Sequence, residues 1–195
     1  MKNKKTLLII ILIFVLLMGG ATVLYRQLGQ SVAAEQLSAQ DTQQTADDTE
    51  EEQKTKAPDF VVYDAEGKEV RLSDYIGKPI VLNFWASWCG PCQSEMPDFH
   101  EKYSELGEEI TFLMINMTDG FRETTESASN FVAENGYTFP VFYDTESNAA
   151  TAYGVYSLPT TFFIDADGYA IAQASGAIDA EILQKGIDMI NQRHR

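Results

Sequence analysis

The only two cysteines of this chain stand three residues apart, as Cys89-Gly90-Pro91-Cys92, directly after an apolar run. A disulfide that stabilises a fold usually joins distant segments, because closing a longer loop constrains the unfolded chain more. A bridge between Cys89 and Cys92 closes a very short loop and adds little stability. The spacing therefore favours a disulfide that opens and closes, and so a redox role for the pair.

The flanking residues predict a strand that leads into a helix. Residues 79–85 are a short, mostly apolar run, which is typical of a buried strand. Pro91 suits the first turn of a helix, where its missing N–H would be unpaired anyway. One apolar face then contains Cys92, Met96, Phe99, Tyr103 and Leu106. We expect Cys92 to point inward, Cys89 to lie exposed at the helix N-terminus, and Pro97 to kink the helix.

The start of a helix is a suitable place for an attacking thiol. Only the thiolate attacks a disulfide, and a thiol with a pKa of about 8.5 is mostly protonated at neutral pH. The unpaired N–H groups and partial positive charge of a helix N-terminus stabilise the anion and lower this pKa. We therefore expect Cys89 to attack a partner disulfide and Cys92 to resolve the mixed disulfide that results.

A zinc site is a second interpretation of two neighbouring cysteines. A structural zinc ion needs four ligands, and His100 and His194 are the only other strong candidates. Their spacing does not fit a zinc site, so we expect no metal at the cysteines.

Glu95 follows Cys92 by three residues, about one turn along the same helix. A glutamate at such a position is usually solvated. A partly buried carboxylate would instead have a raised pKa and would move protons for Cys92. Position alone leaves both interpretations open.

Several motifs between residue 57 and the C-terminus resemble the TlpA/ResA group of membrane-anchored, extracytoplasmic thioredoxin-like proteins. They are Ala57-Pro58-Asp59-Phe60, residues 72–78, residues 83–92, Glu95-Met96-Pro97 and Leu158-Pro159-Thr160-Thr161-Phe162. The resemblance implies an α/β, thioredoxin-like fold, in which helices flank a mixed central sheet that carries an N-terminal hairpin and a TlpA-type insertion. It also implies reduction of disulfides in exported proteins, with apocytochrome c as the substrate of ResA-like members.

The resemblance further assigns roles to individual residues. It places the catalytic glutamate of the family at Glu95. It also implies that Leu158-Pro159 is a cis bond facing the cysteines, so that the backbone of Leu158 can hydrogen-bond an extended substrate segment. An ordinary trans proline that opens a strand is the alternative interpretation of Pro159.

The surroundings of the cysteines depart from the family pattern in two places. The active-site loop between the two cysteines is Gly90-Pro91, which is the dipeptide found in thioredoxin itself. Many ResA-like proteins have an acidic residue there. Asn83 stands where cytosolic thioredoxins have a buried aspartate, so the proton carrier would be Glu95 or water. Trp88, beside the first cysteine, is expected either to cover the site and contact substrates or to serve in packing alone.

The first 57 residues differ from the rest of the chain. Residues 1–5 include three lysines and form the expected cytoplasmic N-terminus, and residues 6–25 are uncharged and mostly apolar. A helix of that length spans about 30 Å, the thickness of a bilayer core. We expect residues 6–25 to be a single-pass signal-anchor in the cell membrane, with the catalytic domain on the extracytoplasmic side. A signal peptide cleaved near Ala21 or Ala33-Ala34 is the alternative.

Residues 26–57 are rich in Gln, Ala, Thr, Asp and Glu, and we expect them to form a disordered linker. Residues 58–195 are then enough for one thioredoxin-like domain. That domain contains eight Lys/Arg and twenty-two Asp/Glu, a net charge of −14. Such a charge repels nucleic acid and anionic lipid headgroups, so we expect no nucleic-acid partner.

Within the domain, the pattern predicts βαβ followed by ββα. The expected elements are a hairpin over 60–63 and 69–72, a strand over 110–116, a helix over 124–135, an insertion with a strand over 141–143 and a helix over 146–153, a hairpin over 160–165 and 169–175, and a final helix capped by Asp179.

Together these features predict a monomeric thiol–disulfide oxidoreductase that reduces exported proteins and receives electrons from a membrane electron donor. Its redox group would be the Cys89–Cys92 disulfide, with no other cofactor. A disulfide-introducing oxidase and a non-enzymatic copper-binding module or metallochaperone are the alternatives. A thiol peroxidase fits less well, because Ala86 stands where those enzymes have the threonine of a Thr-x-x-Cys motif.

Overall fold

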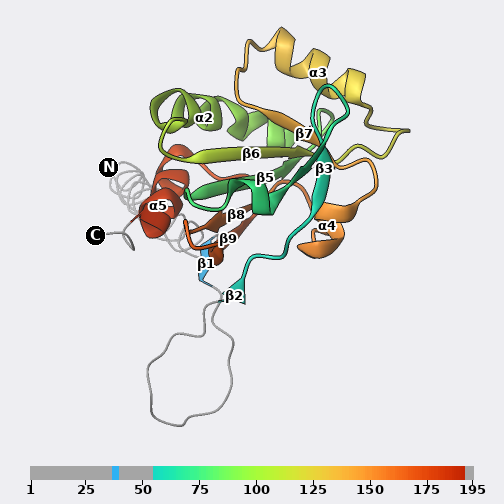
Figure 1. Ribbon diagram of the computed structural model, residues 1–195. Helices are drawn as coiled ribbons and strands as arrows, with labels where there is room; N and C mark the ends of the chain where they lie inside the picture. The colour runs from blue at the N-terminus through green and yellow to red at the C-terminus, as the bar shows by residue number, and fades with distance from the viewer. Residues whose placement is uncertain (1–36, 40–54, 192–195) are drawn as a thin grey trace, which may run out of the picture. The chain divides into compact units, whose positions relative to one another are not determined.

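The computed structural model describes residues 37–39 and 55–191. These residues form a mixed sheet with the strand order β1-β9-β8-β5-β6-β7-β3-β4, and β2 also pairs with β9 (Figure 1). Helices cover the sheet, so the described part of the chain has the α/β architecture that the sequence predicts.

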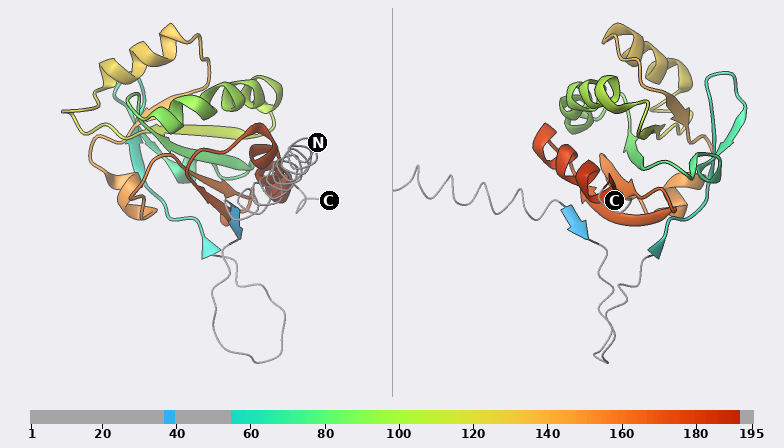
Figure 2. Two further views of the ribbon diagram at one scale, coloured as in Figure 1. Left: turned by 180° about the vertical axis from the view of Figure 1, so that it is seen from behind. Right: turned by 60° about the vertical axis from the view of Figure 1, so that its left-hand side comes forward.

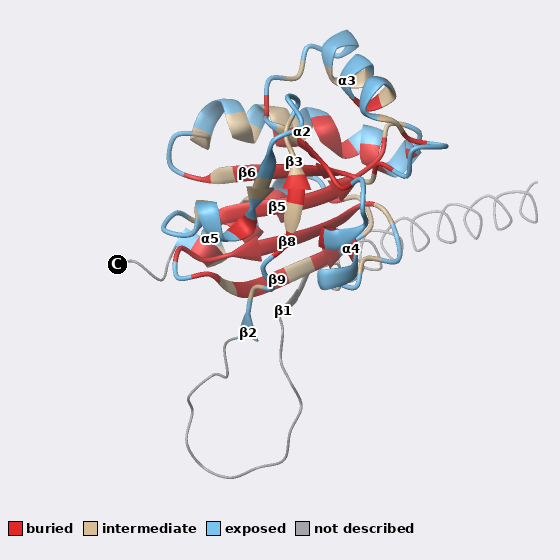
Figure 3. Ribbon diagram, turned by 45° about the vertical axis from the view of Figure 1, so that its right-hand side comes forward, coloured by how far each residue is buried: buried red, intermediate tan, exposed pale blue. Residues whose placement is uncertain are grey.

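Four strands form the centre of the sheet. They are β5 (Ile80–Trp85), β6 (Thr111–Asn116), β8 (Thr160–Ile164) and β9 (Tyr169–Ser175). β6 is parallel to β5 and is connected to it through α2 (Gly90–Leu106), whereas β8 is antiparallel to β5 and β9 is antiparallel to β8. Every residue of β5 is buried, because packed layers cover both of its faces (Figure 3).

Alternate residues of β5 enter two different hydrophobic cores. Val81 and Trp85 join the core beneath α2 and α5 (Ala180–Asn191), which lie side by side on one face of the sheet (Figure 2). Cys89 and Cys92 belong to this first core. The second core lies on the opposite face and contains Ile80, Leu82 and Phe84 together with Phe60, Val62, Leu72 and Ala149.

The segment between β6 and β8 extends the sheet. It contains α3 (Thr125–Glu134), β7 (Val141–Tyr143) and α4 (Asn148–Ala152). β7 pairs with β6 and also with β3 (Val61–Tyr63), which forms the predicted hairpin with β4 (Glu69–Arg71) ahead of the 3-10 helix η1 (Leu72–Tyr75). The sequence predicts the hairpin and the insertion as separate additions. The structure joins them in one sheet.

The expectation of a disordered linker over 26–57 is wrong at two places. β1 (Leu37–Ala39) and β2 (Thr55–Lys56) both pair antiparallel with β9, and the N–H of Ala57 donates to the carbonyl of Gly168 at 2.9 Å. Disorder was expected because residues 26–57 have few apolar side chains to bury. A strand at the edge of a sheet instead gains main-chain hydrogen bonds, which polar residues form equally well.

The predicted anchor over 6–25 lies outside the described residues. Within 37–39 and 55–191, no helix is long and apolar enough to cross a membrane.

The final helix follows the prediction closely. The Asp179 carboxylate accepts a hydrogen bond from the N–H of Ile182 at 2.9 Å, which caps the first turn of α5. Its apolar residues Ile182, Leu183, Ile187 and Ile190 are buried.

Candidate active site

Cys89 and Cys92 form a disulfide at the junction of β5 and α2. Cys89 is the N-cap residue of α2, and its sulfur lies 3.3 Å from the backbone N of Cys92, which donates to it. Pro91 occupies the first turn of the helix, as predicted. An anion on the Cys89 sulfur would therefore meet a backbone N–H and the positive end of the helix dipole.

The prediction that Cys89 lies exposed is wrong. Cys89 is only 5% exposed and Cys92 is fully buried. Trp88, the residue before Cys89, and Leu158, from the segment that precedes β8, line the same pocket as Cys89.

Glu95 is buried with 1% of its surface exposed, so the interpretation of Glu95 as a solvated surface acid is wrong. One carboxylate oxygen accepts from the side-chain amide of Asn83 at 2.9 Å, and the other accepts from the backbone N–H of Ile178 at 3.0 Å. The carboxylate therefore connects α2 with β5 and with the segment that precedes α5.

The pKa of Glu95 rises from its ordinary 4.5 to about 7, mainly because the carboxyl group is buried and to a lesser extent because the charge of Asp98 lies nearby. The two hydrogen bonds from Ile178 and Asn83 oppose this rise, because they stabilise the carboxylate. A carboxyl group that titrates near neutral pH can both accept and donate a proton under physiological conditions.

Asn83 positions this carboxylate, which sequence analysis missed. Its amide nitrogen also donates to the hydroxyl of Thr161 on β8 at 3.0 Å. Its carbonyl oxygen is buried and has no hydrogen-bond partner among the described residues. The sequence indicated only that Asn83 cannot titrate. Its hydrogen bond to Glu95 depends on the crossing of β5 and α2.

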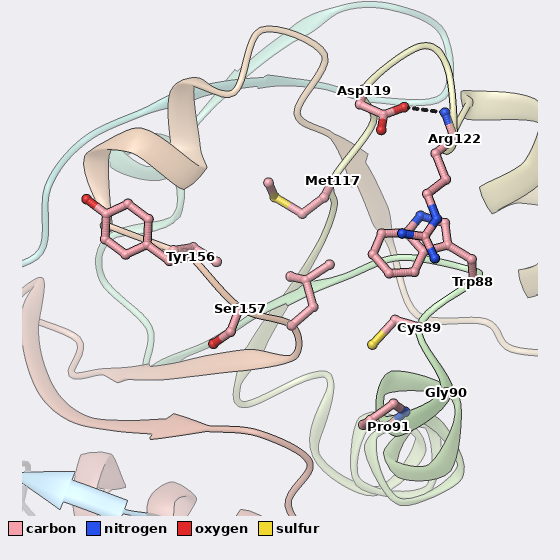
Figure 4. A pocket seen from close by; sticks show the side chains of 11 residues that line it. Trp88, Cys89, Gly90, Pro91, Met117, Asp119, Arg122, Tyr156 and Ser157 are labelled. Carbon is pink, nitrogen blue, oxygen red and sulfur yellow. Dashed lines mark hydrogen bonds between the residues drawn. The ribbon is translucent and has the colours of Figure 1, made fainter.

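A pocket of about 590 Å³ opens beside Cys89. Its lining comes from the active-site loop, from the loop after β6 and from the segment that leads to the cis proline: Trp88, Cys89, Gly90, Pro91, Met117, Asp119, Arg122, Val155, Tyr156, Ser157 and Leu158 (Figure 4). The structure thus brings Trp88, Gly90, Pro91 and Leu158 together with Cys89, as the sequence predicts.

No pattern in the sequence pointed to the other half of this lining. Residues 117–123 lie between the predicted strand over 110–116 and the predicted helix over 124–135. Residues 154–157 follow the predicted helix over 146–153 and have no recognisable motif. Tyr156 is 98% exposed and Trp88 is 41% exposed. In the sequence, the aromatic Tyr156 in the segment before the strand is the one feature that could have pointed to a binding surface.

The peptide bond between Leu158 and Pro159 is cis, as predicted. The carbonyl of Pro159 accepts from the N–H of Gly176 at 2.9 Å, which fixes the bond beside the end of β9. Leu158 itself lines the pocket at Cys89.

The described residues contain no cluster of three or more His, Cys, Asp or Glu side chains that could hold a metal ion. His100 lies on the outer part of α2, where its ring hydrogen-bonds the hydroxyl of Thr138 at 3.2 Å. His194 lies outside the described residues.

The AhpC/TSA family model matches residues 54–172 of this chain. The chain is 41% identical over 138 residues to a thiol-disulfide oxidoreductase ResA from Bacillus thuringiensis subsp. konkukian, which covers 69% of this chain and 76% of the relative. It is 33% identical over 135 residues to the protein of the same name from Bacillus subtilis strain 168, which covers 69% of this chain and 73% of that protein.

Solved structures of similar fold include a putative thiol:disulfide interchange protein DsbE from Chlorobium tepidum. The similarity has a TM-score of 0.61 and 32% sequence identity, over 69% of this chain and 94% of the other. A DsbF homologue from Corynebacterium diphtheriae has a TM-score of 0.63 and 29% identity, over 76% of this chain and 99% of the other. The thioredoxin-like fold expected from the sequence is therefore confirmed.

The raised pKa of Glu95 predicts a pH-dependent stability. Between about pH 4.5 and 7 the folded protein keeps the proton that the unfolded chain has lost, so the free energy of unfolding falls as the pH rises through this window. The loss amounts to about 3 kcal/mol at most. Denaturant unfolding of the oxidised protein at pH 5 and pH 8 should show this loss in the wild type and not in Glu95→Gln.

Glu101→Gln is the matched control, because Glu101 is an exposed glutamate on the same helix. It should retain the wild-type difference between the two pH values. An equal pH dependence of the free energy of unfolding in the wild type and Glu95→Gln would contradict the raised pKa of Glu95.

Proposed function

This chain belongs to the AhpC/TSA family and to its ResA-like, thioredoxin-fold thiol–disulfide oxidoreductases, and from that premise we propose that it is a membrane-anchored reductant of disulfides in exported proteins. The observation that carries the proposal is the Cys89 sulfur at the N-terminus of α2, 3.3 Å from the amide nitrogen of Cys92. This position stabilises a thiolate, which is the attacking species in disulfide exchange.

Reduction of a substrate begins from the dithiol. The Cys89 thiolate attacks one sulfur of the substrate disulfide, forms a mixed disulfide and releases the other substrate sulfur as a thiolate. The Cys92 thiolate then attacks the Cys89 sulfur, re-forms the Cys89–Cys92 disulfide and releases the second substrate thiolate. Two electrons and two protons pass from the protein dithiol to the substrate.

Glu95 supplies the base for the second step. Cys92 is fully buried and must lose its proton before it attacks, and burial in apolar surroundings holds a thiol protonated. Glu95 follows one turn later on the same buried face of α2, and its pKa of about 7 suits it to take up that proton. The proton then leaves on a departing substrate thiolate.

The direction of electron flow follows from the active-site loop. Gly90-Pro91 is the dipeptide of thioredoxin, a reductant with a potential of about −270 mV, against about −120 mV for the oxidant DsbA. A reductant outside the cytoplasm needs electrons from a membrane protein that carries them across the bilayer. The lysines of residues 1–5 and the apolar residues 6–25 support a single-pass anchor with the domain on the extracytoplasmic side.

The substrate class follows from the family. The motifs around the cysteines resemble ResA-like proteins, which supports apocytochrome c as a substrate. We propose that the protein acts as a monomer, in which Cys89, Cys92 and the residues that line the pocket all belong to one chain.

The proposed direction predicts a low reduction potential. Equilibration of the Cys89–Cys92 pair against glutathione or a dithiol buffer should give a value near −270 mV. A value near −120 mV would contradict the reductant and favour a disulfide-introducing oxidase.

The proposed attack by Cys89 predicts a trapped intermediate. In cells, the variant Cys92→Ala should accumulate mixed disulfides with its substrates, because no thiol remains to resolve them. Cys89→Ala is the matched control and should trap nothing. The trapped species should fractionate with membranes and include cytochrome c precursors. A broad mixture of exported proteins without these precursors would contradict the cytochrome assignment and indicate a general reductase.

The proposed base predicts a pH-dependent resolving step. Decay of the mixed disulfide should accelerate with an inflection near pH 7 in the wild type, and Glu95→Gln should slow it by about 100-fold and remove the inflection. Rapid-quench kinetics across pH 5–9 measure this, with Glu101→Gln as the control. An unchanged profile in Glu95→Gln would leave water as the proton acceptor.

A further inference from the structure

The pocket beside Cys89 has the composition of a protein-binding surface. Its exposed rim contains Trp88 and Tyr156, and Phe121, on the same loop as Arg122, is 95% exposed. Tryptophan, tyrosine and arginine are the residues that most often carry binding energy at protein interfaces. The pocket is thus suited to a polypeptide segment that presents its cysteine to Cys89.

Arg122 supplies a positive charge to this surface. Its guanidinium carbon lies 3.5 Å from the centre of the Trp88 ring, and it covers the ring above Cys89 (Figure 4). Stacking uses one face of the guanidinium and leaves its N–H groups directed outward at the edge. Among the described residues, these N–H groups make no hydrogen bond or ion pair, and Arg122 is the only lysine or arginine that lines the pocket.

The charge of Asp119 lies close enough to interact with that of Arg122. Its carboxylate, however, forms its hydrogen bonds with the loop backbone and not with the guanidinium. One of its oxygens accepts from the backbone N–H groups of Phe121, Arg122 and Glu123 at 2.7 to 2.9 Å. These bonds, and to a lesser extent the charge of Arg122, lower the pKa of Asp119, which therefore stays ionised.

Glu123 fixes the same loop to the active-site segment. Its carboxylate is fully buried and accepts from the backbone N–H of Ser87 at 2.8 Å, from the Ser87 hydroxyl at 2.7 Å and from the amide of Asn116 at 2.7 Å. Ser87 stands two residues before Cys89. The backbone of Arg122 is therefore held in place relative to the attacking cysteine before any substrate binds, which lowers the entropy cost of recognition.

We propose that Arg122 is a specificity-determining residue that binds a carboxylate of the substrate polypeptide near the cysteine attacked by Cys89. The inference rests on the proposed action on protein disulfides. Aspartate and glutamate are the side chains that match the edge of a guanidinium in charge and geometry. The net charge of −14 on residues 58–195 repels strongly acidic chains at long range, so the preferred segment carries a single carboxylate and not an acidic run.

A set of disulfide-bonded peptides tests this inference. The peptides place one glutamate, glutamine or lysine at each of the three positions on either side of the cysteine and are otherwise identical. At one of these positions, the purified full-length protein should reduce the glutamate peptide with a kcat/KM about tenfold above that of the glutamine peptide, mainly through KM. Arg122→Gln should abolish this preference, and Arg122→Glu should transfer it to the lysine peptide.

Lys68→Glu is the matched control. Lys68 is exposed on the turn between β3 and β4 and does not line the pocket, yet this variant changes the net charge by the same amount as Arg122→Glu. It should leave the ranking of the peptides unchanged. A parallel shift in ranking would show that the overall field, and not Arg122, sets the preference, and would overturn the inference.

A second readout separates this inference from the proposed function. Peptides with serine in place of cysteine cannot react, and their binding to the wild type and the variants is followed through tryptophan fluorescence. The wild type should bind the glutamate peptide about tenfold more tightly than the glutamine peptide. If the serine peptides show this preference but the disulfide-bonded peptides are not reduced, the proposed reductase activity is rejected and the inference is retained. Equal binding of the glutamate, glutamine and lysine peptides at every position would overturn the inference even if all are reduced.

Discussion

The site depends on the direct passage of β5 into α2. Because the helix begins at the residue after Cys89, the backbone N–H of Cys92 lies 3.3 Å from the Cys89 sulfur, and the helix dipole points at the same atom. A fully buried central strand holds this junction from below (Figure 3). The reactive thiol therefore sits on a rigid scaffold, while the surfaces that receive the substrate come from loops.

Burial of the Glu95 carboxyl group is the main electrostatic cost in the described site. Two hydrogen bonds, from Asn83 and Ile178, stabilise its charged form, but burial outweighs them and the pKa rises to about 7. If Glu95 served only in packing, an uncharged residue at this position would make the protein more stable above neutral pH. This cost in stability supports the proton-transfer role proposed for Glu95.

Long-range and local charge act differently around the pocket. The domain is strongly acidic, which favours solubility and repels nucleic acid. At the pocket, Arg122 stacks on Trp88, and the two acidic neighbours Asp119 and Glu123 are occupied by hydrogen bonds within the protein. Arg122 thus places a positive charge beside Cys89 although the domain as a whole is acidic, while the ionised Asp119 lines the same pocket.

The sequence determined the elements whose evidence is local. The Cys89–Cys92 spacing, the apolar run before it and the proline in the first turn were enough to place a redox pair at a strand–helix junction, and apolar periodicity located most other elements. The burial of Cys89, the hydrogen bond between Asn83 and Glu95, and the position of Arg122 over Trp88 became visible only in the folded chain. These contacts join segments far apart in the chain, and no local pattern encodes the packing of one segment against another. For the same reason composition could not reveal that residues 37–39 and 55–56 pair with the edge of β9, since main-chain hydrogen bonds leave no signature in side-chain type.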